Sequence, residues 1–394
     1  AVGGLNRPLH RQTRRKHAEI IAPQRRPGGT QTRLIKKGRV ISANKRENFR
    51  HGPAKLAVNF DSILTLSPHA TGKQHLPETT PPPPTVILIA GPTASGKSDL
   101  ALALANRLGA DIINADASQV YGDLPLLSAR PGDKELAQAA HHLYGHVDGA
   151  TRYSVGQWSR DVAVTLADCA RRQVAAIMVG GTGLYFRALE SGLSPIPAVP
   201  DAIMRDGMAH YDEMGAEAFA AEVIAVDPPM VRLAPNDRQR LVRAWSVYRH
   251  SGAPLSVFQA APGEPVLQSP PTARLVLMPD RNALYDRCDH RFEAMLAAGA
   301  LAEVAALKAR KLSPTLPVMS ALGARELMDH LAGSTSLDAA TALAQRNTRR
   351  FAKRQMTWFR NQTATWPIAP NIDAALERVL DQLPAGIKEA RNLR

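Results

Sequence analysis

Short apolar segments alternate with longer segments of helical periodicity through most of the chain after residue 85. The apolar segments are rich in β-branched residues, as expected of strands that are buried on both faces. They lie at residues 86–90, 111–116, 174–179 and 274–278. Apolar positions recur at helical spacing at 99–105 and 157–166, and we expect residues 132–175 to be mostly helical. The alternation predicts an α/β fold in which helices flank a parallel sheet.

A change in composition interrupts this alternation between residues 195 and 268. Proline-rich joints there frame helical stretches at 204–226 and 237–250, which predicts a mainly helical insertion. After the strand at 274–278 the pattern is helical, at 285–296, 301–311, 322–331 and 339–360. We therefore expect a core at 85–194 and 272–365, an insertion at 195–271 and a C-terminal tail at 366–394.

The first 84 residues show no sustained helical or strand period. Residues 1–80 hold 16 basic and four acidic residues, whereas the remainder holds 33 and 31, so most of the net charge of +14 lies here. Such a segment, ending in the prolines at 81–84, is typical of a disordered basic arm. A nucleic-acid tether and an organellar transit peptide are alternatives. We favour a segment outside the functional unit, because the motifs described below are complete without it.

Two absences in the sequence narrow the class of protein. No apolar run approaches the roughly 18–20 residues of a membrane span, so we expect no membrane partner. The two cysteines, Cys169 and Cys288, lie far apart and without metal-ligand spacing, which argues against a disulfide scaffold or a structural zinc site. We expect a cytoplasmic protein.

The clearest chemical signal is the glycine-rich segment after the first apolar run. Residues 91–98 match the P-loop pattern G-x-x-x-x-G-K-[ST], between a predicted strand and a predicted helix. The glycines let backbone amides curl around phosphate oxygens, Lys97 neutralises their charge, and the Ser98 hydroxyl is placed to bind Mg²⁺. The predicted phosphate-binding residues are Gly91, Pro92, Thr93, Ala94, Ser95, Gly96, Lys97 and Ser98. The loop alone does not say which phosphate it binds.

Two other strands end in residues suited to a ligand site. Asp116 follows the second strand, at the edge where ligands bind in open α/β sheets. Its carboxylate is suited to bind Mg²⁺, to accept a proton or to cap a helix. The third strand ends in Gly180-Gly181-Thr182, where an ordinary P-loop ATPase would present a Mg²⁺-organising Asp. Glycines at this point favour close backbone approach by a ligand.

Basic residues cluster on three predicted helices. Arg240 and Arg243 are three positions apart and present two guanidinium groups to one surface, for which a solvated helix face is the simplest interpretation. Arg287 and Arg291 lie one turn apart in the helix at 285–296. In the helix at 339–360, basic residues interleave with aromatic ones. That pattern suits a nucleic-acid surface, and inward packing of the aromatics explains it equally well.

Five motifs, in family order, closely resemble the tRNA dimethylallyltransferase family, whose members prenylate N6 of the adenosine 3′ to the anticodon. They are Gly-Pro-Thr-Ala-Ser-Gly-Lys-Ser at 91–98, Asn-Ala-Asp-Ala-Ser-Gln-Val-Tyr at 114–121, Val-Gly-Gly-Thr-Gly-Leu-Tyr at 179–185, Asn-Asp-Arg-Gln-Arg-Leu-Val-Arg-Ala at 236–244 and Ala-Lys-Arg-Gln-Met-Thr-Trp-Phe-Arg at 352–360. The resemblance spans about residues 85–365. It implies a P-loop NTPase-like catalytic core of α/β class with a helical insertion that contacts tRNA.

The resemblance also implies substrates and roles. The P-loop would bind dimethylallyl diphosphate, with Mg²⁺ on Ser98, and the acceptor would be adenosine 37 in the anticodon stem-loop of tRNAs that read codons beginning with U. Asp116 matches the general base, Arg291 matches an arginine on the diphosphate side, and Thr182 would lie where the two substrates meet. The tRNA contacts would come from Asp116, Ala117, Ser118, Gln119, Gln239, Arg240, Leu241, Val242, Arg243, Ser320 and Gly323. We expect a monomer.

Two positions depart from the family pattern: Ala117 stands where Ser is usual, and Ala324 where Tyr is usual. Three other functions are alternatives. A P-loop kinase for a small metabolite would not need the Arg240 and Arg243 surface, and an adenylate isopentenyltransferase acting on a free nucleotide would not need the insertion. The third alternative is an RNA-binding protein with a vestigial P-loop, against which the intact Lys97 and Asp116 argue.

Overall fold

Six parallel strands form the centre of the protein. The computed structural model describes residues 85–388, so the basic arm expected at 1–84 lies outside the described residues. The sheet order is β3-β2-β4-β1-β5-β6, and each neighbouring pair is parallel. The strands are β1 (Val86–Ala90), β2 (Asp111–Asn114), β3 (His141–His142), β4 (Ala176–Gly180), β5 (Ala273–Leu277) and β6 (Ile368–Ala369). The predicted α/β fold with a parallel sheet is confirmed.

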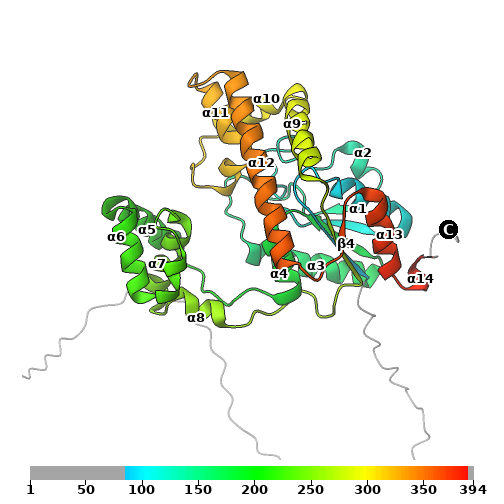
Figure 1. The fold of residues 1–394 in the computed structure, drawn as a ribbon, viewed down its shortest axis with the longest axis horizontal. Coiled ribbons are helices and arrows are strands. Elements are labelled where there is room, and N and C mark those ends of the chain that lie inside the picture. The colour runs from blue at the N-terminus through cyan, green and yellow to red at the C-terminus, as the bar shows by residue number, and fades with distance from the viewer. Residues whose placement is uncertain (1–84, 389–394) are drawn as a thin grey trace, which may run out of the picture. The chain divides into compact units, whose positions relative to one another are not determined.

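Helices cover both faces of this sheet (Figure 1). One face packs on α1 (Lys97–Leu108) and α13 (Ile372–Gln382), and the other on α3 (Val155–Arg172), α4 (Gly183–Ser191) and α12 (Leu337–Gln362). In β1, Ile87 and Ile89 join the first apolar core while Leu88 joins the second. Because both faces are buried, β1 has to be apolar at every position, which explains the continuous run in the sequence.

The segment at 132–175 differs from the prediction that it would be mostly helical. It contains the short helix α2 (Asp133–Leu136), the edge strand β3, a loop and only then α3. Strand β3 consists of two histidines that pair with Ile112 and Ile113 of β2. Two adjacent polar residues are too few to show the alternating pattern of a strand. Their extended conformation depends on pairing with a strand about thirty positions earlier in the sequence. The helical prediction was therefore wrong for this part.

The region expected as an insertion is helical and has an apolar core of its own. Its elements are α5 (Asp201–Met214), α6 (Ala216–Val226), η1 (Pro228–Arg232), α7 (Arg238–Ser251) and α8 (Leu255–Ala260). The single helix predicted at 204–226 is divided at Gly215, whose φ of 80° a helix does not accommodate. Phe219 and Leu241 are fully buried in the core between these helices.

The C-terminal part returns to the sheet. Its helices before the last strand are α9 (Arg281–Ala297), α10 (Ala300–Ala309), η2 (Pro317–Ser320), α11 (Ala324–Leu331) and α12. Beyond them, the segment expected as a tail adds β6 beside β5, and α13 and α14 (Ala385–Lys388) follow. Ala375 and Val379 of α13 are buried in the same apolar core as α1, so this segment belongs to the core as far as residue 388. None of the helices between residues 85 and 388 is long and apolar enough to cross a membrane.

Candidate active site

The P-loop joins the central strand β1 to α1 with the curl predicted from its sequence. Ala94 and Gly96 both have positive φ, of 61° and 92°, which turns successive amides toward one side of the loop. Gly91 is required for a different reason: a Cβ atom there would lie 2.6 Å from the carbonyl oxygen of Leu277 in β5. The loop can therefore sit directly over the carboxyl ends of β1 and β5.

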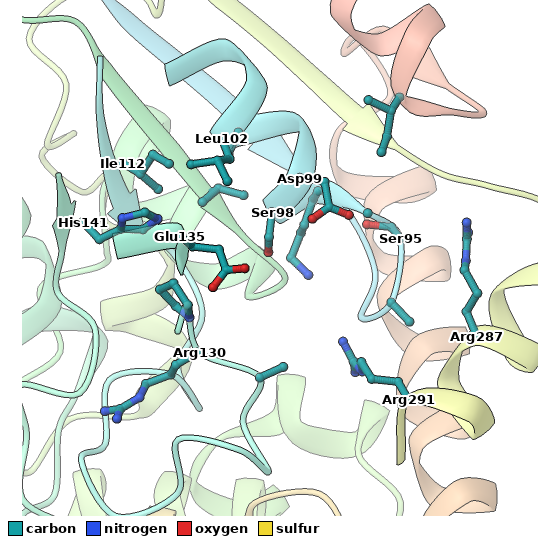
Figure 2. Close-up of a pocket in the computed structure, with 18 of the residues that line it drawn as sticks. Ser95, Ser98, Asp99, Leu102, Ile112, Arg130, Glu135, His141, Arg287 and Arg291 are labelled. Atoms are coloured by element: carbon teal, nitrogen blue, oxygen red, sulfur yellow. The ribbon is translucent and has the colours of Figure 1, made fainter. Parts of the chain in front are cut away.

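Two cations face this loop. The Lys97 ammonium lies 3.4 Å from the carbonyl oxygen of Pro92, and burial lowers the pKa of Lys97 to about 8, with the Asp116 carboxylate opposing that shift. Arg291 of α9 donates a hydrogen bond to the Thr93 hydroxyl at 2.5 Å, and burial lowers its pKa as well. Figure 2 shows Arg291 pointing from α9 toward the loop. Two half-buried cations beside the backbone amides at the start of α1 make this a strong anion site.

The Asp116 carboxylate is held in one orientation two residues beyond β2. Its Oδ1 atom accepts hydrogen bonds from the amide and the hydroxyl of Ser118, at 3.0 and 2.6 Å. Its own amide donates to Asn114 Oδ1 at 2.8 Å, and Trp158 Nε1 donates to the Asn114 carbonyl at 2.9 Å. A Cβ atom built on Gly181 would lie 3.2 Å from Asp116 Oδ2, so this second oxygen faces the turn after β4.

The turn after β4 lies between Asp116 and the P-loop, because β4 separates β2 from β1 in the sheet. Gly180 allows the approach, since a Cβ atom there would lie 2.0 Å from the Ala115 carbonyl oxygen. Thr182 Oγ1 accepts a hydrogen bond from the Ala117 amide at 2.9 Å. The predicted group of Asp116, Thr182 and the P-loop is thus assembled at one edge of the sheet.

One buried residue in this region was given no role by the sequence analysis. Gln355 of α12 accepts a hydrogen bond from the Thr93 amide at 2.9 Å and donates one to the Gly181 carbonyl at 2.8 Å. The Thr93 amide is therefore already paired. The sequence did carry a signal, because Gln355 stands next to Met356 on the inner face of a helix whose other buried residues are apolar except for Thr348.

Two cavities, each of about 650 Å³, meet at the P-loop and share Lys97, Ser98 and Arg291. The first, shown in Figure 2, extends past Glu135 and Arg287. The second contains the catalytic candidates together with residues of the insertion and of η2, namely Asp116, Ala117, Ser118, Gln119, Thr182, Gln239 and Ser320. Phosphate-binding groups thus open on one side to a cavity that holds a carboxylate.

The residues predicted to contact RNA lie in different environments in the structure. Arg240 is exposed and lies 3.2 Å from Asp237, while Arg243 is half-buried and has its pKa lowered by that burial. Gln119 is engaged within its own loop, donating to the carbonyls of Ser128 and Ala129. Gly323 is buried, with a φ of 83°.

Within the run 239–243, which stays a prediction for RNA contact, the side chains of Leu241 and Val242 face the protein interior. Both side chains are at most 1% exposed and belong to the apolar core of the insertion. On a helix, neighbours in sequence point in different directions, so a run cannot present every side chain to one partner. Only the side chains of Gln239, Arg240 and Arg243 in this run reach the surface.

The fold and this site define the class of protein: an α/β enzyme with a P-loop for a phosphorylated substrate, a carboxylate opposite that loop, and no acid at the end of β4. Comparison with known proteins identifies the family within this class. Residues 119–362 match the IPP transferase family and residues 84–145 match the isopentenyl transferase family. The chain belongs to the IPP transferase family.

Relatives and solved structures agree with that placement. The chain is 51% identical to a tRNA dimethylallyltransferase of Phenylobacterium zucineum, over 72% of this chain and 92% of the relative. It is 49% identical to a tRNA dimethylallyltransferase of Maricaulis maris, over 76% and 98%. It also resembles the crystal structure of the full-length tRNA isopentenylpyrophosphate transferase of Bacillus halodurans, with a TM-score of 0.55 and 27% identity over 78% of this chain and 98% of that one.

Proposed function

We propose that this protein transfers the dimethylallyl group of dimethylallyl diphosphate to N6 of adenosine 37 in tRNA, which gives N6-(dimethylallyl)adenosine and diphosphate. The tRNA substrates would be those that read codons beginning with U. The observation that carries the proposal is the second cavity, where the phosphate-binding groups and the Asp116 carboxylate face one space. The relatives named above as tRNA dimethylallyltransferases support it.

The diphosphate end of the substrate would lie against the P-loop. Lys97, Arg291 and the amides from Gly96 onward would stabilise the negative charge that grows as the carbon–oxygen bond breaks, which favours departure of diphosphate. Mg²⁺ is usually bound by one or two protein ligands together with phosphate oxygens and water, and the exposed Ser98 hydroxyl fits that role. Between residues 85 and 388 no cluster of three or more acidic, His or Cys residues offers a separate metal site. When bound, Mg²⁺ would neutralise charge on the leaving diphosphate.

The acceptor amine requires help because an exocyclic adenine amine is a weak nucleophile. As the N6–carbon bond forms, the amine loses a proton, and Asp116 Oδ2 is the oxygen available to accept it because Oδ1 is occupied by Ser118. The Thr182 hydroxyl lies between this carboxylate and the P-loop. Once the acceptor base fills this cavity it would keep water from the allylic carbon, which water would otherwise attack.

The acceptor base must leave the stack of the anticodon loop to reach Asp116, as other base-modifying enzymes require. Cationic side chains on two helices, α7 and α12, lie along the path by which the base would reach Asp116. Arg354 of α12 and Gln239 of α7 both line the second cavity, and Arg240 is exposed beside Gln239. Such groups bind the phosphate backbone and leave selection of the base to the cavity.

A transfer assay tests this function directly. Labelled dimethylallyl diphosphate is offered to unmodified tRNA with adenosines at positions 36 and 37, with AMP and ATP as competing acceptors. We expect label in the tRNA alone, and a kcat lowered about 10²- to 10⁴-fold in Asp116→Asn. Label entering AMP would instead support the adenylate isopentenyltransferase alternative, and transfer of the ATP γ-phosphate would support the kinase.

A further inference from the structure

Gln355 is a buried amide placed between the two loops that hold the substrates. Its side chain comes from α12, and the residue is 6% exposed. Its oxygen accepts from the Thr93 amide at 2.9 Å, and its nitrogen donates to the Gly181 carbonyl at 2.8 Å. One backbone group is a donor and the other an acceptor, so only a side chain with both functions satisfies the pair.

Each of these two loops positions a different reacting group. Thr93 belongs to the P-loop, and its hydroxyl accepts the hydrogen bond from Arg291. Gly181 is followed by Thr182, which holds the amide beside Asp116. A Cβ atom on Gly181 would lie 2.3 Å from Gln355 Nε2 and 3.2 Å from Asp116 Oδ2, so the amide and the carboxylate lie on the same side of this turn. Gln355 therefore spans the space between the diphosphate side and the base side.

The rest of the inner face of α12 is mostly apolar. Ala352, Met356 and Phe359 are almost fully buried there. The other buried polar side chain with a hydrogen bond, Thr348, donates to its own helix. A buried glutamine costs desolvation, which is offset only by the two hydrogen bonds it makes to the loops.

We infer that Gln355 is a positioning residue that fixes the distance between the P-loop and the Gly181–Thr182 turn, and through them the distance between the leaving diphosphate and the Asp116 carboxylate. This inference rests on the proposed function. Loss of the amide leaves a buried donor and a buried acceptor without partners, and the two loops can then separate. Misplacement of reacting groups by about 1 Å lowers rates by as much as about 10²-fold.

The same helix supplies a matched control. Gln345 also crosslinks α12 to another element, donating to the Asp289 carbonyl and to Glu293 Oε1 of α9 at 3.3 and 3.1 Å, and it does not line either cavity at the P-loop. Gln345→Leu and Gln355→Leu remove comparable side-chain bridges from one helix. Only the second breaks the connection between the substrate loops.

The test is the single-turnover rate of dimethylallyl transfer to tRNA with both substrates saturating. We expect Gln355→Leu to lower this rate about 10- to 100-fold and Gln345→Leu to change it less than about twofold. Equal rates for the two variants, measured on folded protein, would overturn the inference. Failure of the wild-type protein to prenylate tRNA would instead count against the proposed function.

A second variant, Gln355→Glu, tests the inference if Gln355→Leu does not fold. In Gln355→Glu, a protonated carboxyl group restores one donor and one acceptor, whereas the carboxylate faces the Gly181 carbonyl with a negative charge. The rate of this variant relative to wild type should rise at least tenfold from about pH 8 to about pH 5.5. A ratio that stays constant over this interval contradicts a role for the paired donor and acceptor.

Discussion

Lys97 is the residue whose charge depends most directly on its surroundings in this site. Burial lowers its pKa to about 8 from an ordinary value of 10.5, and Arg291 nearby adds to that effect. A diphosphate bound against the ammonium would favour the charged form and raise the pKa again. Ligand binding and protonation of Lys97 are therefore linked.

The affinity for dimethylallyl diphosphate should accordingly depend on pH above about 8. Below that value Lys97 is already charged, and binding takes up no proton. Above it, binding must take up one proton, so the dissociation constant should rise up to about tenfold per pH unit. Titration calorimetry in two buffers of different ionisation enthalpy measures both the affinity and the proton uptake. Lys97→Met should bind weakly at every pH and show no such uptake. An affinity that stays level to about pH 9.5 would contradict the linkage.

At the scale of single elements, the inner and outer faces of α12 carry different kinds of residue. Its inner face holds Gln355 and the apolar residues that pack on the sheet, while Arg350, Lys353 and Arg354 are exposed. The sequence left open whether the aromatic residues of this helix face nucleic acid. Phe359 is 1% exposed and Trp358 packs on Gly183, where a Cβ atom would lie 2.4 Å from the indole, so these two rings face the protein.

The exposed cations of α12 should contribute to tRNA binding through phosphate contacts. Arg350→Ala and Lys353→Ala, combined, should raise the KM for tRNA and reduce the slope of log K against log salt by about 2, one for each lost contact. The affinity for dimethylallyl diphosphate should not change. Filter binding across a salt series gives the slope, and Arg107→Ala, at the exposed end of α1, is the control. If the double variant and the wild-type protein give the same slope, Arg350 and Lys353 of α12 do not contact the RNA backbone.

At the scale of the whole described chain, the insertion and the core are joined by two connecting segments that touch. Leu193 and Glu264 form an isolated antiparallel bridge between them. Gly192 has a φ of 73°, and a Cβ atom there would lie 2.4 Å from the Glu264 carbonyl carbon. This crossing leaves no space for a side chain, so it fixes where the insertion leaves the core.

Gly192→Ala should therefore cost more than its backbone conformation alone explains. Gly215 has a φ of 80° and nothing within 4 Å of a built Cβ atom, so Gly215→Ala measures the conformational cost by itself, about 1–3 kcal/mol. We expect Gly192→Ala to lose more stability in thermal unfolding and to raise the KM for tRNA, because the insertion carries Gln239 and Arg240. Similar melting temperatures and KM values in the two variants would show that the crossing is easily rearranged.

The sequence by itself determined the α/β class, the P-loop and the identity of Asp116, Thr182 and Arg291 as candidates. The class and the loop follow from local chemistry, because a buried strand must be apolar and a phosphate loop needs glycines with Lys and Ser at fixed spacing. The roles of Asp116, Thr182 and Arg291 came from the resemblance of the motifs to a known family. The adjacency of the P-loop, Asp116 and Thr182 could be expected because parallel strands end at one edge of the sheet.

Only the tertiary structure decided which residues act together in the site and which pack in the core. It placed Gln355 between two loops more than 170 positions away in the sequence, formed β3 from two histidines beside β2, and turned Leu241 and Val242 into the core beside the exposed Arg240. It also returned residues 368–382 to the sheet as β6 and α13. These outcomes depend on contacts between distant segments, and no local period or motif encodes which segments will meet.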